Sequence, residues 1–266
     1  MTVPGVRPLG WKGLPTYVLV ECGITVDSEG LVRVPYFLAD GGLYAHRVVA
    51  PSGRRWWEPG DGRPVVPFGL EVLPDFHDRA GHVLFVSEGE SDRLALMAAY
   101  GSEAVDTLGI PGAAMWRAEW RTLLEGFDRV YVVPDGDEAG RELGLAVKYG
   151  PSWVRNQRLL PAERQELADD GFAAALVVQL PAGKDARGIL QGPGGVQEFE
   201  TYIRTAEYDR KVAIGFRYAE TLDELRAYML GEPDGLFVTL RATAGDGARV
   251  LPFPMDEGVV DVRSAA

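Results

Sequence analysis

The sequence predicts an α/β protein with a mainly parallel sheet and flanking helices, and three features of its middle section support this. Short apolar runs recur along that section, stretches of helical pattern separate them, and an acidic cluster follows three of the runs. A continuous apolar run is expected of a strand that is buried on both faces. Strands that alternate with helices form right-handed βαβ units around a parallel sheet.

The elements of this sheet can be placed on the sequence. The expected strands are 83–86, 104–108, 130–133 and 174–180. The expected helices are 91–100, 115–124, 138–148 and 161–171. We therefore expect one domain of the Rossmann-like kind over residues 81–200.

The two flanking regions have other patterns. Residues 1–80 begin with an irregular lead-in over 1–15 and continue as a β-like, turn-rich mixed subdomain, with strands expected over 31–37 and 43–49. Residues 201–266 predict a small α+β appendage. Its expected parts are 212–216, a helix over 221–230, 235–240 and 248–253.

Composition narrows the class of protein. Of 266 residues, 46% are hydrophobic and 25% charged, which is typical of a soluble globular chain. No apolar run reaches the roughly 18 residues that a membrane span needs, and the start of the chain lacks a signal-peptide pattern, so we expect a cytoplasmic protein with no membrane partner. The single cysteine, Cys22, excludes an internal disulfide and a zinc ribbon built from this chain alone. The net charge of −12 argues against a surface that is basic throughout.

Carboxylates follow three of the expected strands. Glu88 comes after the first, Asp135 and Asp137 after the third, and Asp185 after the fourth. The carboxyl ends of parallel strands meet at one edge of a sheet, where ligands bind in open α/β folds. Carboxylates held close together must take up protons or share a cation. Oxygen ligands without a histidine or cysteine set favour Mg²⁺ or Mn²⁺.

Each cluster has an ordinary interpretation when taken alone. An Asp-x-Asp after a strand is more often a turn with a helix cap than a metal site. Lys184 and Asp185 could form a surface ion pair of little energetic value. The combination of all the clusters, in order and each after an apolar run, favours the metal site.

Four motifs carry a resemblance to a known family. These are Glu88-Gly89 with Asp92, Leu108 to Ala113, Asp135-Gly136-Asp137 with Gly140 and Arg141, and Leu180 to Ala186. Over about 82–190 the sequence resembles the Toprim family, and in particular the catalytic core of phage-type, DnaG-like DNA primases. A weaker resemblance extends upstream to about residue 24.

The resemblance implies synthesis of short RNA primers on single-stranded DNA from ribonucleoside triphosphates. Asp135 and Asp137, with help from Asp185, would hold Mg²⁺ or Mn²⁺, and Glu88 would be a further ligand or the general base. The residues expected at nucleotides or nucleic acid are Lys184, Arg47, Arg54, Arg55, Asp92 and Arg141. A replicative helicase or a separate DNA-binding protein is an expected partner.

The sequence departs from the family pattern at two places. Primases usually carry a lysine-rich patch upstream of Toprim, whereas this chain has Lys12 there, with Arg47, Arg54 and Arg55 as possible substitutes. Cellular primases tend to place a carboxylate two residues after the position of Asp185, and this chain has Arg187. Two alternatives therefore stay open: a Toprim nuclease that hydrolyses phosphodiester bonds, and a non-catalytic module that binds nucleic acid or a replication partner.

Overall fold

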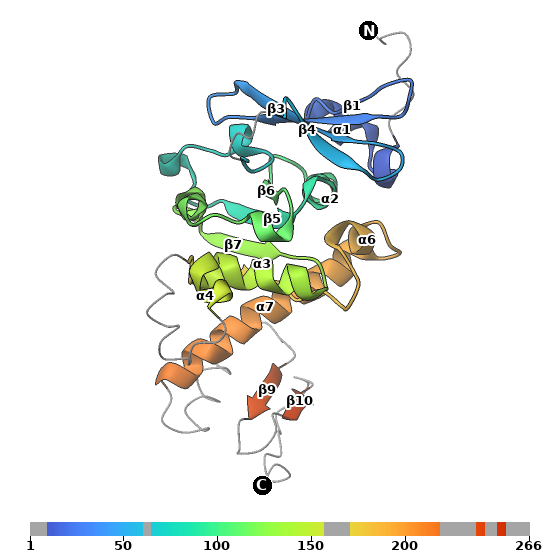
Figure 1. Ribbon diagram of the computed structural model, residues 1–266. Helices are drawn as coiled ribbons and strands as arrows, with labels where there is room; N and C mark the ends of the chain where they lie inside the picture. The colour runs from blue at the N-terminus through green and yellow to red at the C-terminus, as the bar shows by residue number, and fades with distance from the viewer. Residues whose placement is uncertain (1–9, 61–64, 157–170, 219–237, 243–248, 254–266) are drawn as a thin grey trace. The chain divides into compact units, whose positions relative to one another are not determined.

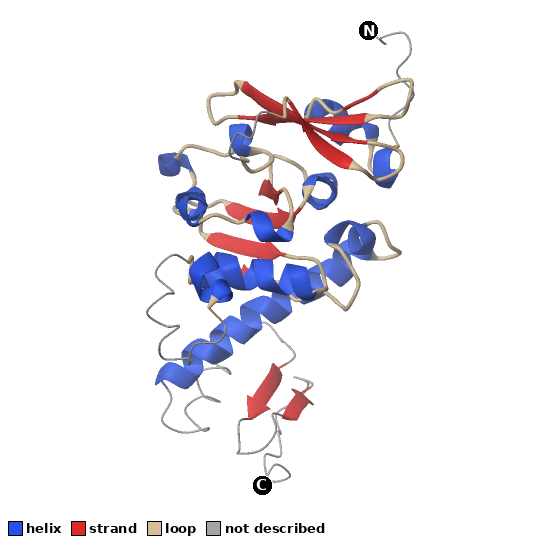
Figure 2. Cartoon of the chain, in the orientation of Figure 1, coloured by secondary structure: helices blue, strands red, loops and turns tan. Residues whose placement is uncertain are grey.

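The computed structural model describes residues 10–60, 65–156, 171–218, 238–242 and 249–253. The chain divides into two compact units, Met1–Tyr202 and Ile203–Ala266. The first unit contains two sheets (Figures 1 and 2). No helix in the described ranges is long and apolar enough to cross a membrane.

The first sheet is antiparallel and lies in the N-terminal part of the chain. Its strand order is β1-β2-β3-β4, with bounds Thr25–Val26, Val32–Phe37, Leu43–Val49 and Arg55–Glu58. Val34 and Tyr36 of β2 are fully buried. They belong to one hydrophobic core with Leu19 of helix α1 (Thr16–Glu21) and Leu94 of helix α2 (Glu90–Tyr100). This core joins the antiparallel sheet to a helix of the second sheet's domain.

The second sheet is parallel throughout, which confirms the predicted fold class. Its order is β6-β5-β7-β8, with bounds Asp106–Ile110, Val83–Glu88, Arg129–Val133 and Leu176–Val177. On one face, Val86 and Val132 pack with Leu143 of helix α3 (Glu138–Tyr149). On the other face, Phe85 stacks on Tyr100 of α2. Helices therefore cover both faces, as the alternation of strands and helices requires.

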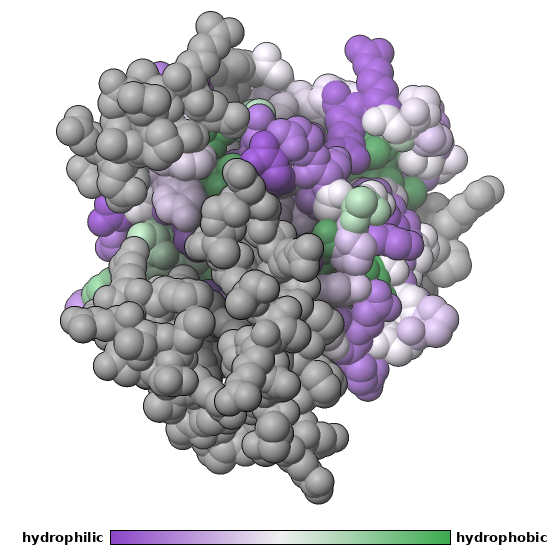
Figure 3. All heavy atoms as spheres, turned by 90° about the horizontal axis from the view of Figure 1, so that it is seen from below, coloured by the Kyte–Doolittle hydropathy of each residue, from purple (hydrophilic) through white to green (hydrophobic). Residues whose placement is uncertain are grey.

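Three further helices contribute to the first unit. They are the short helices α4 (Pro151–Arg155) and α6 (Ala186–Leu190) and the start of the long helix α7 (Gly195–Tyr218). Single 3₁₀ turns or short 3₁₀ helices cover Trp11–Gly13, Leu70–Val72, Phe76–Asp78, Ala113–Met115 and Ala118–Leu124. Among the described residues visible in Figure 3, hydrophilic side chains predominate and hydrophobic ones form small separate areas.

Several predicted elements differ from the structure. The strand expected over 174–180 pairs only at Leu176–Val177, since the residues before it still form a turn in which the Ala175 amide donates to the Phe172 carbonyl at 2.9 Å. The strand expected over 104–108 lies two residues later, at Asp106–Ile110. The helix expected over 115–124 is 3₁₀ in character. Thr16–Glu21 is helical within a region expected to be β-like, since Val18 and Leu19 bury one side of that short helix.

The second unit also differs in part from its prediction. Residues 212–216, expected as a separate part of the appendage, belong to α7, because no proline separates them from the helix that begins at Gly195. Strands β9 (Val238–Ala242) and β10 (Arg249–Phe253) pair antiparallel, close to the two later runs. The helix expected over 221–230, like most of 161–171, lies outside the described residues.

Candidate active site

The carboxyl edge of the parallel sheet brings the predicted acidic segments together. Glu88 is the last residue of β5, and Gly89 then turns the chain at φ 90° into α2. Asp135 and Asp137 follow β7, and the Asp137 carboxylate caps α3 by accepting a hydrogen bond from the Gly140 amide at 2.8 Å. Asp137 is therefore both the N-cap of α3 and a member of the acidic motif.

Backbone hydrogen bonds join the two loops that carry the aspartates. The Gly136 amide donates to the Lys184 carbonyl at 2.7 Å, and the Gly183 amide donates to the Gly136 carbonyl at 2.8 Å. A Cβ atom at Gly136 would collide with the Pro181 carbonyl oxygen. Glycine at position 136 thus allows the loop of Asp135 and Asp137 to lie against the loop of Asp185.

The carboxylates are close enough to shift one another's protonation. Burial, followed by the negative charges of Asp92, Glu88, Asp185 and Asp137, raises the pKa of Asp135 to about 7. Burial and the charge of Asp137 also raise the pKa of Glu88, against hydrogen bonds from the amides of Asp135 and Ala113. Such mutual repulsion is relieved by protons or by a cation.

The donor set fits a hard divalent cation that keeps several other ligands. The Glu88 Oε2 atom is buried and has no hydrogen-bond partner among the described residues. No three His, Cys, Asp or Glu side chains within the described ranges converge as a ready-made metal cage. Mg²⁺ is usually held by one or two carboxylates, with water and substrate phosphates as the other ligands. This edge matches that pattern better than a closed structural site.

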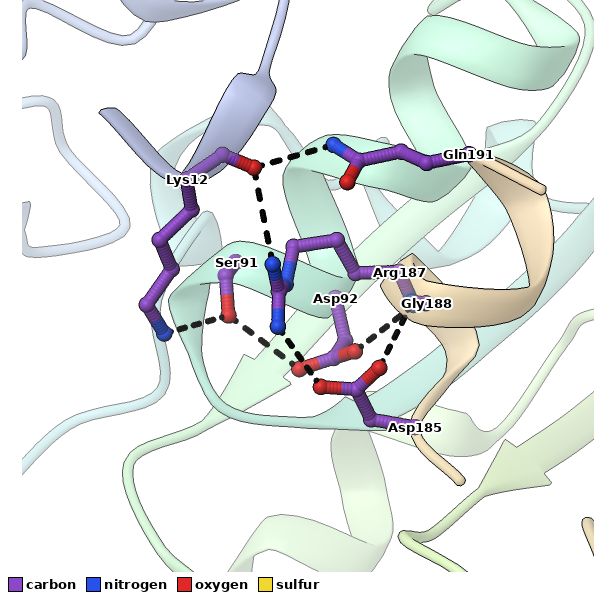
Figure 4. Close-up of polar contacts among 7 residues, drawn as sticks. All are labelled: Lys12, Ser91, Asp92, Asp185, Arg187, Gly188 and Gln191. Atoms are coloured by element: carbon purple, nitrogen blue, oxygen red, sulfur yellow. Dashed lines mark hydrogen bonds and ion pairs between the residues drawn. The ribbon is translucent and has the colours of Figure 1, made fainter. Parts of the chain in front are cut away.

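Asp92 and Asp185 lie in a separate network with two cations (Figure 4). The Arg187 amide donates to Asp92 Oδ1 at 2.9 Å, and Arg187 Nη2 donates to Asp185 Oδ2 at 2.9 Å. Lys12 Nζ donates to the Ser91 hydroxyl at 2.9 Å, and that hydroxyl donates to Asp92 Oδ2 at 3.3 Å. Burial and the charges of Arg55 and Arg187 lower the pKa of Lys12.

The predicted basic residues fall into two groups. Lys184, Arg54 and Arg55 are exposed, and Arg54 lies over the Trp56 ring at 5.8 Å. Arg141 is also exposed and pairs with Glu138. All four side chains can therefore be reached by a charged ligand from solvent.

Arg47 differs from the other predicted basic residues. Its side chain is only 15% exposed, and it donates to the Pro111 carbonyl at 2.7 Å and pairs with Glu90 at 3.5 Å. Glu90 in turn accepts a hydrogen bond from the Tyr36 hydroxyl at 2.7 Å. Arg47 thus connects the antiparallel sheet to the loop after β6, instead of presenting a free guanidinium.

Sequence reasoning missed some members of these networks. Lys12 was considered only as a remnant of a basic patch, and its contact with Ser91 spans 79 residues, which no local pattern reveals. Glu90 lies two residues after Glu88, and its burial depends on partners in β2 and β3. For Arg187 the sequence offers one signal, which is that an arginine stands where cellular primases tend to have a carboxylate.

Comparisons with known proteins agree with this architecture. No protein-family model matches the chain. The gene 57 protein of Mycobacterium phage D29 is 32% identical over 81 residues, which is 30% of this chain and 49% of that protein. The chain thus matches about half the length of that relative.

Solved structures of primases are similar over much more of the chain. The primase fragment of the bacteriophage T7 primase-helicase has a TM-score of 0.52 at 17% identity, over 78% of this chain and 82% of the fragment. The DnaG catalytic core has a TM-score of 0.51 at 16% identity, over 84% of this chain and 81% of that core. A T7 assembly of lagging-strand DNA polymerase with gp4 primase domains, bound to an RNA/DNA hybrid and dTTP, has a TM-score of 0.52 at 18% identity, over 76% and 90%. The chain has the fold of DnaG-like primase cores, which confirms the predicted resemblance.

Proposed function

We propose that this chain is a primase core that synthesises short RNA primers on single-stranded DNA by metal-dependent nucleotidyl transfer. The observation that supports it most directly is the group of mutually repelling carboxylates at the carboxyl edge of β5 and β7, in a fold shared with primase cores. A purely structural cap would not need several partly buried acids to raise one another's pKa.

Each carboxylate has a distinct part in this proposal. Asp135 and Asp137 would hold Mg²⁺ or Mn²⁺, and the ion, when bound, would supply positive charge for the triphosphate and for the primer 3′-hydroxyl. Asp185 lies in the adjoining loop, where its carboxylate pairs with Arg187. Glu88 is a further ligand or the general base, and its buried Oε2 atom has no competing donor in the described residues. The raised pKa of Glu88 makes its carboxylate a stronger base than an ordinary glutamate.

The exposed cations would be phosphate ligands. Lys184 lies in the same loop as Asp185, Arg55 is the first residue of β4 and acts on the pKa of Lys12, and Arg54 precedes it. Arg141, on the first turn of α3, can exchange its exposed partner Glu138 for a phosphate. Asp92 orients cations at the edge and does not contact an anion directly. Arg47 positions the loop after β6 through its contacts with the Pro111 carbonyl and Glu90, between the antiparallel and the parallel sheet.

The net charge of −12 gives little general attraction to a nucleic-acid backbone. We therefore propose a helicase or a separate DNA-binding protein as the partner that supplies template affinity, with the reaction taking place in the cytoplasm.

Ribonucleotide incorporation on single-stranded DNA, run beside a nicking assay on supercoiled DNA, tests the function. Wild type should extend primers, and Asp135→Asn/Asp137→Asn should not. Asp106→Asn is a control for the loss of an aspartate charge elsewhere in the same sheet, because Asp106 lies at the amino end of β6, where it pairs with His82. Nicking without incorporation would identify a nuclease instead. Template binding with neither activity would identify a non-catalytic module.

A further inference from the structure

The acidic edge contains two carboxylate groups with different surroundings. All four oxygens of Asp92 and Asp185 accept hydrogen bonds from the protein. The donors are the Arg187 amide and the Ser91 hydroxyl to Asp92, and the Gly188 amide at 2.6 Å and the Arg187 guanidinium at 2.9 Å to Asp185. By contrast, Glu88 has a buried oxygen with no such donor within the described ranges.

Arg187 lies between the two aspartates and is held there from a third direction. Its backbone contacts Asp92 and its guanidinium contacts Asp185, while Nη1 lies 3.5 Å from the Lys12 carbonyl (Figure 4). Gln191, one turn further along, donates to the same carbonyl at 3.1 Å. The arginine side chain is three-quarters buried, so it is positioned by these contacts and is not a mobile surface cation.

The negative charges of the two aspartates explain why an arginine lies beside them. Two carboxylates that are close together need a positive charge between them, and a guanidinium keeps its charge at any physiological pH. The Arg187 guanidinium supplies that charge at Asp185 Oδ2, where the Gly188 amide holds the second oxygen. Asp92 meets the Arg187 amide and the Ser91 hydroxyl instead.

We infer that Arg187 acts as a built-in cation that takes the place of a divalent metal at the Asp185 carboxylate, beside Asp92. Metal binding at this edge is then confined to Glu88, Asp135 and Asp137. The inference deepens the proposed function and rests on it for the metal at those three residues. It follows that removing the guanidinium opens a new cation position that wild type does not have.

Counting bound Mn²⁺ tests this without any activity assay. Free Mn²⁺ is quantified by electron paramagnetic resonance during titration of wild type and Arg187→Gln. Arg187→Gln keeps the backbone amide that contacts Asp92 and should bind one more Mn²⁺ per chain than wild type. In Arg187→Gln/Asp185→Asn that additional ion should be lost.

Arg33→Gln is the matched control. Arg33 also lies between two carboxylates, Asp27 at 2.8 Å and Glu58 at 3.5 Å, but in the antiparallel sheet. Its removal changes the net charge equally and should leave the Mn²⁺ count unchanged. A folded Arg187→Gln that binds as many ions as wild type would overturn the inference, as would an equal gain in Arg33→Gln.

Asp185→Asn alone gives a second route if Arg187→Gln does not fold. Because Asp185 is neutralised by arginine, this variant should keep the wild-type Mn²⁺ count, and the loss of an ion would overturn the inference. The proposed function is judged separately. If wild type binds no Mn²⁺ while Arg187→Gln binds one, the metal at Glu88, Asp135 and Asp137 fails and the role of Arg187 stands.

Discussion

Glu88 and Glu90 are two residues apart, yet one lies among other carboxylates and the other is paired with a cation. Glu90 faces the interface between the two sheets, is 4% exposed, and has both Tyr36 and Arg47 as partners. Glu88 faces the carboxyl edge, where its neighbours are other acids and one of its oxygens is orphaned. The interface uses paired charge to join two parts of the fold, whereas the edge leaves charge unpaired for a ligand. Substitutions in the two regions should therefore have opposite effects on activity and stability.

The largest effect on activity is expected from the paired aspartates of the edge. Asp135→Asn/Asp137→Asn should lower primer synthesis by about 10³-fold or more, since a bound metal supplies several kcal/mol of charge stabilisation and each 1.36 kcal/mol is tenfold. Mn²⁺ affinity should fall in parallel, while the melting temperature should not fall. Unchanged Mn²⁺ affinity in the folded double variant would remove these residues from the metal site.

Glu88→Gln is expected to be the next most severe. Glutamine fills the same space but cannot accept a proton, so activity should fall by about 10²-fold or more with the melting temperature within a few degrees of wild type. Circular dichroism melting and single-turnover incorporation measure the two quantities. Near-normal turnover in a well-folded Glu88→Gln would show that this acid has no part in the chemistry.

Tyr36→Phe should have the reverse profile. It removes the 2.7 Å hydrogen bond to the buried Glu90, and such bonds to charged groups contribute about 2 kcal/mol. A loss of that size lowers the melting temperature by roughly 4 to 8 °C in a unit of this length. Activity below the melting transition should stay within about twofold of wild type, since no edge carboxylate is touched. A large activity loss without destabilisation would contradict the comparison.

The last prediction concerns the dependence of stability on pH in metal-free protein, where no effect on activity is involved. Asp135 has a pKa of about 7 when folded, above its ordinary value of 3.8. Its contribution to stability is therefore full below about pH 4 and is lost as pH rises through 7. Asp135→Asn should flatten this part of the stability profile and make the metal-free protein more stable at pH 8. Urea unfolding from pH 5 to 8 without divalent ions measures the free energy of unfolding of both proteins. If that free energy depends more steeply on pH in Asp135→Asn than in wild type, the prediction is wrong.

The acidic edge was predictable from sequence because its signals are local. An apolar run followed by a carboxylate places Glu88 at the end of a buried strand, and the parallel pairing of β5 with β7 brings the Asp135 loop to the same edge. The metal roles of these residues stay predictions. Strand boundaries were less predictable, since an apolar run such as 174–180 does not reveal whether it has one neighbour or two.

The cationic partners were less predictable because they depend on contacts between distant segments. Arg47 was interpreted as a phosphate ligand from its residue type, but its burial follows from Glu90 and Pro111, which are supplied by another sheet. The hydrogen bond of Lys12 to Ser91 has the same limitation. Nothing around position 12 indicates that Ser91 is its partner.

The contact between Lys12 and Arg187 also implies an order in which parts of the first unit can form during synthesis. The two residues are 175 positions apart, so a ribosome makes Lys12 long before the segment that fixes its carbonyl. Contacts of such separation form late, because the intervening chain must first be ordered. The antiparallel sheet can pair early from local hairpins, but the closure of its lead-in segment against α6 waits for almost the whole first unit. The carboxylates that follow β5 and β7 are therefore synthesised before the arginine that contacts Asp185.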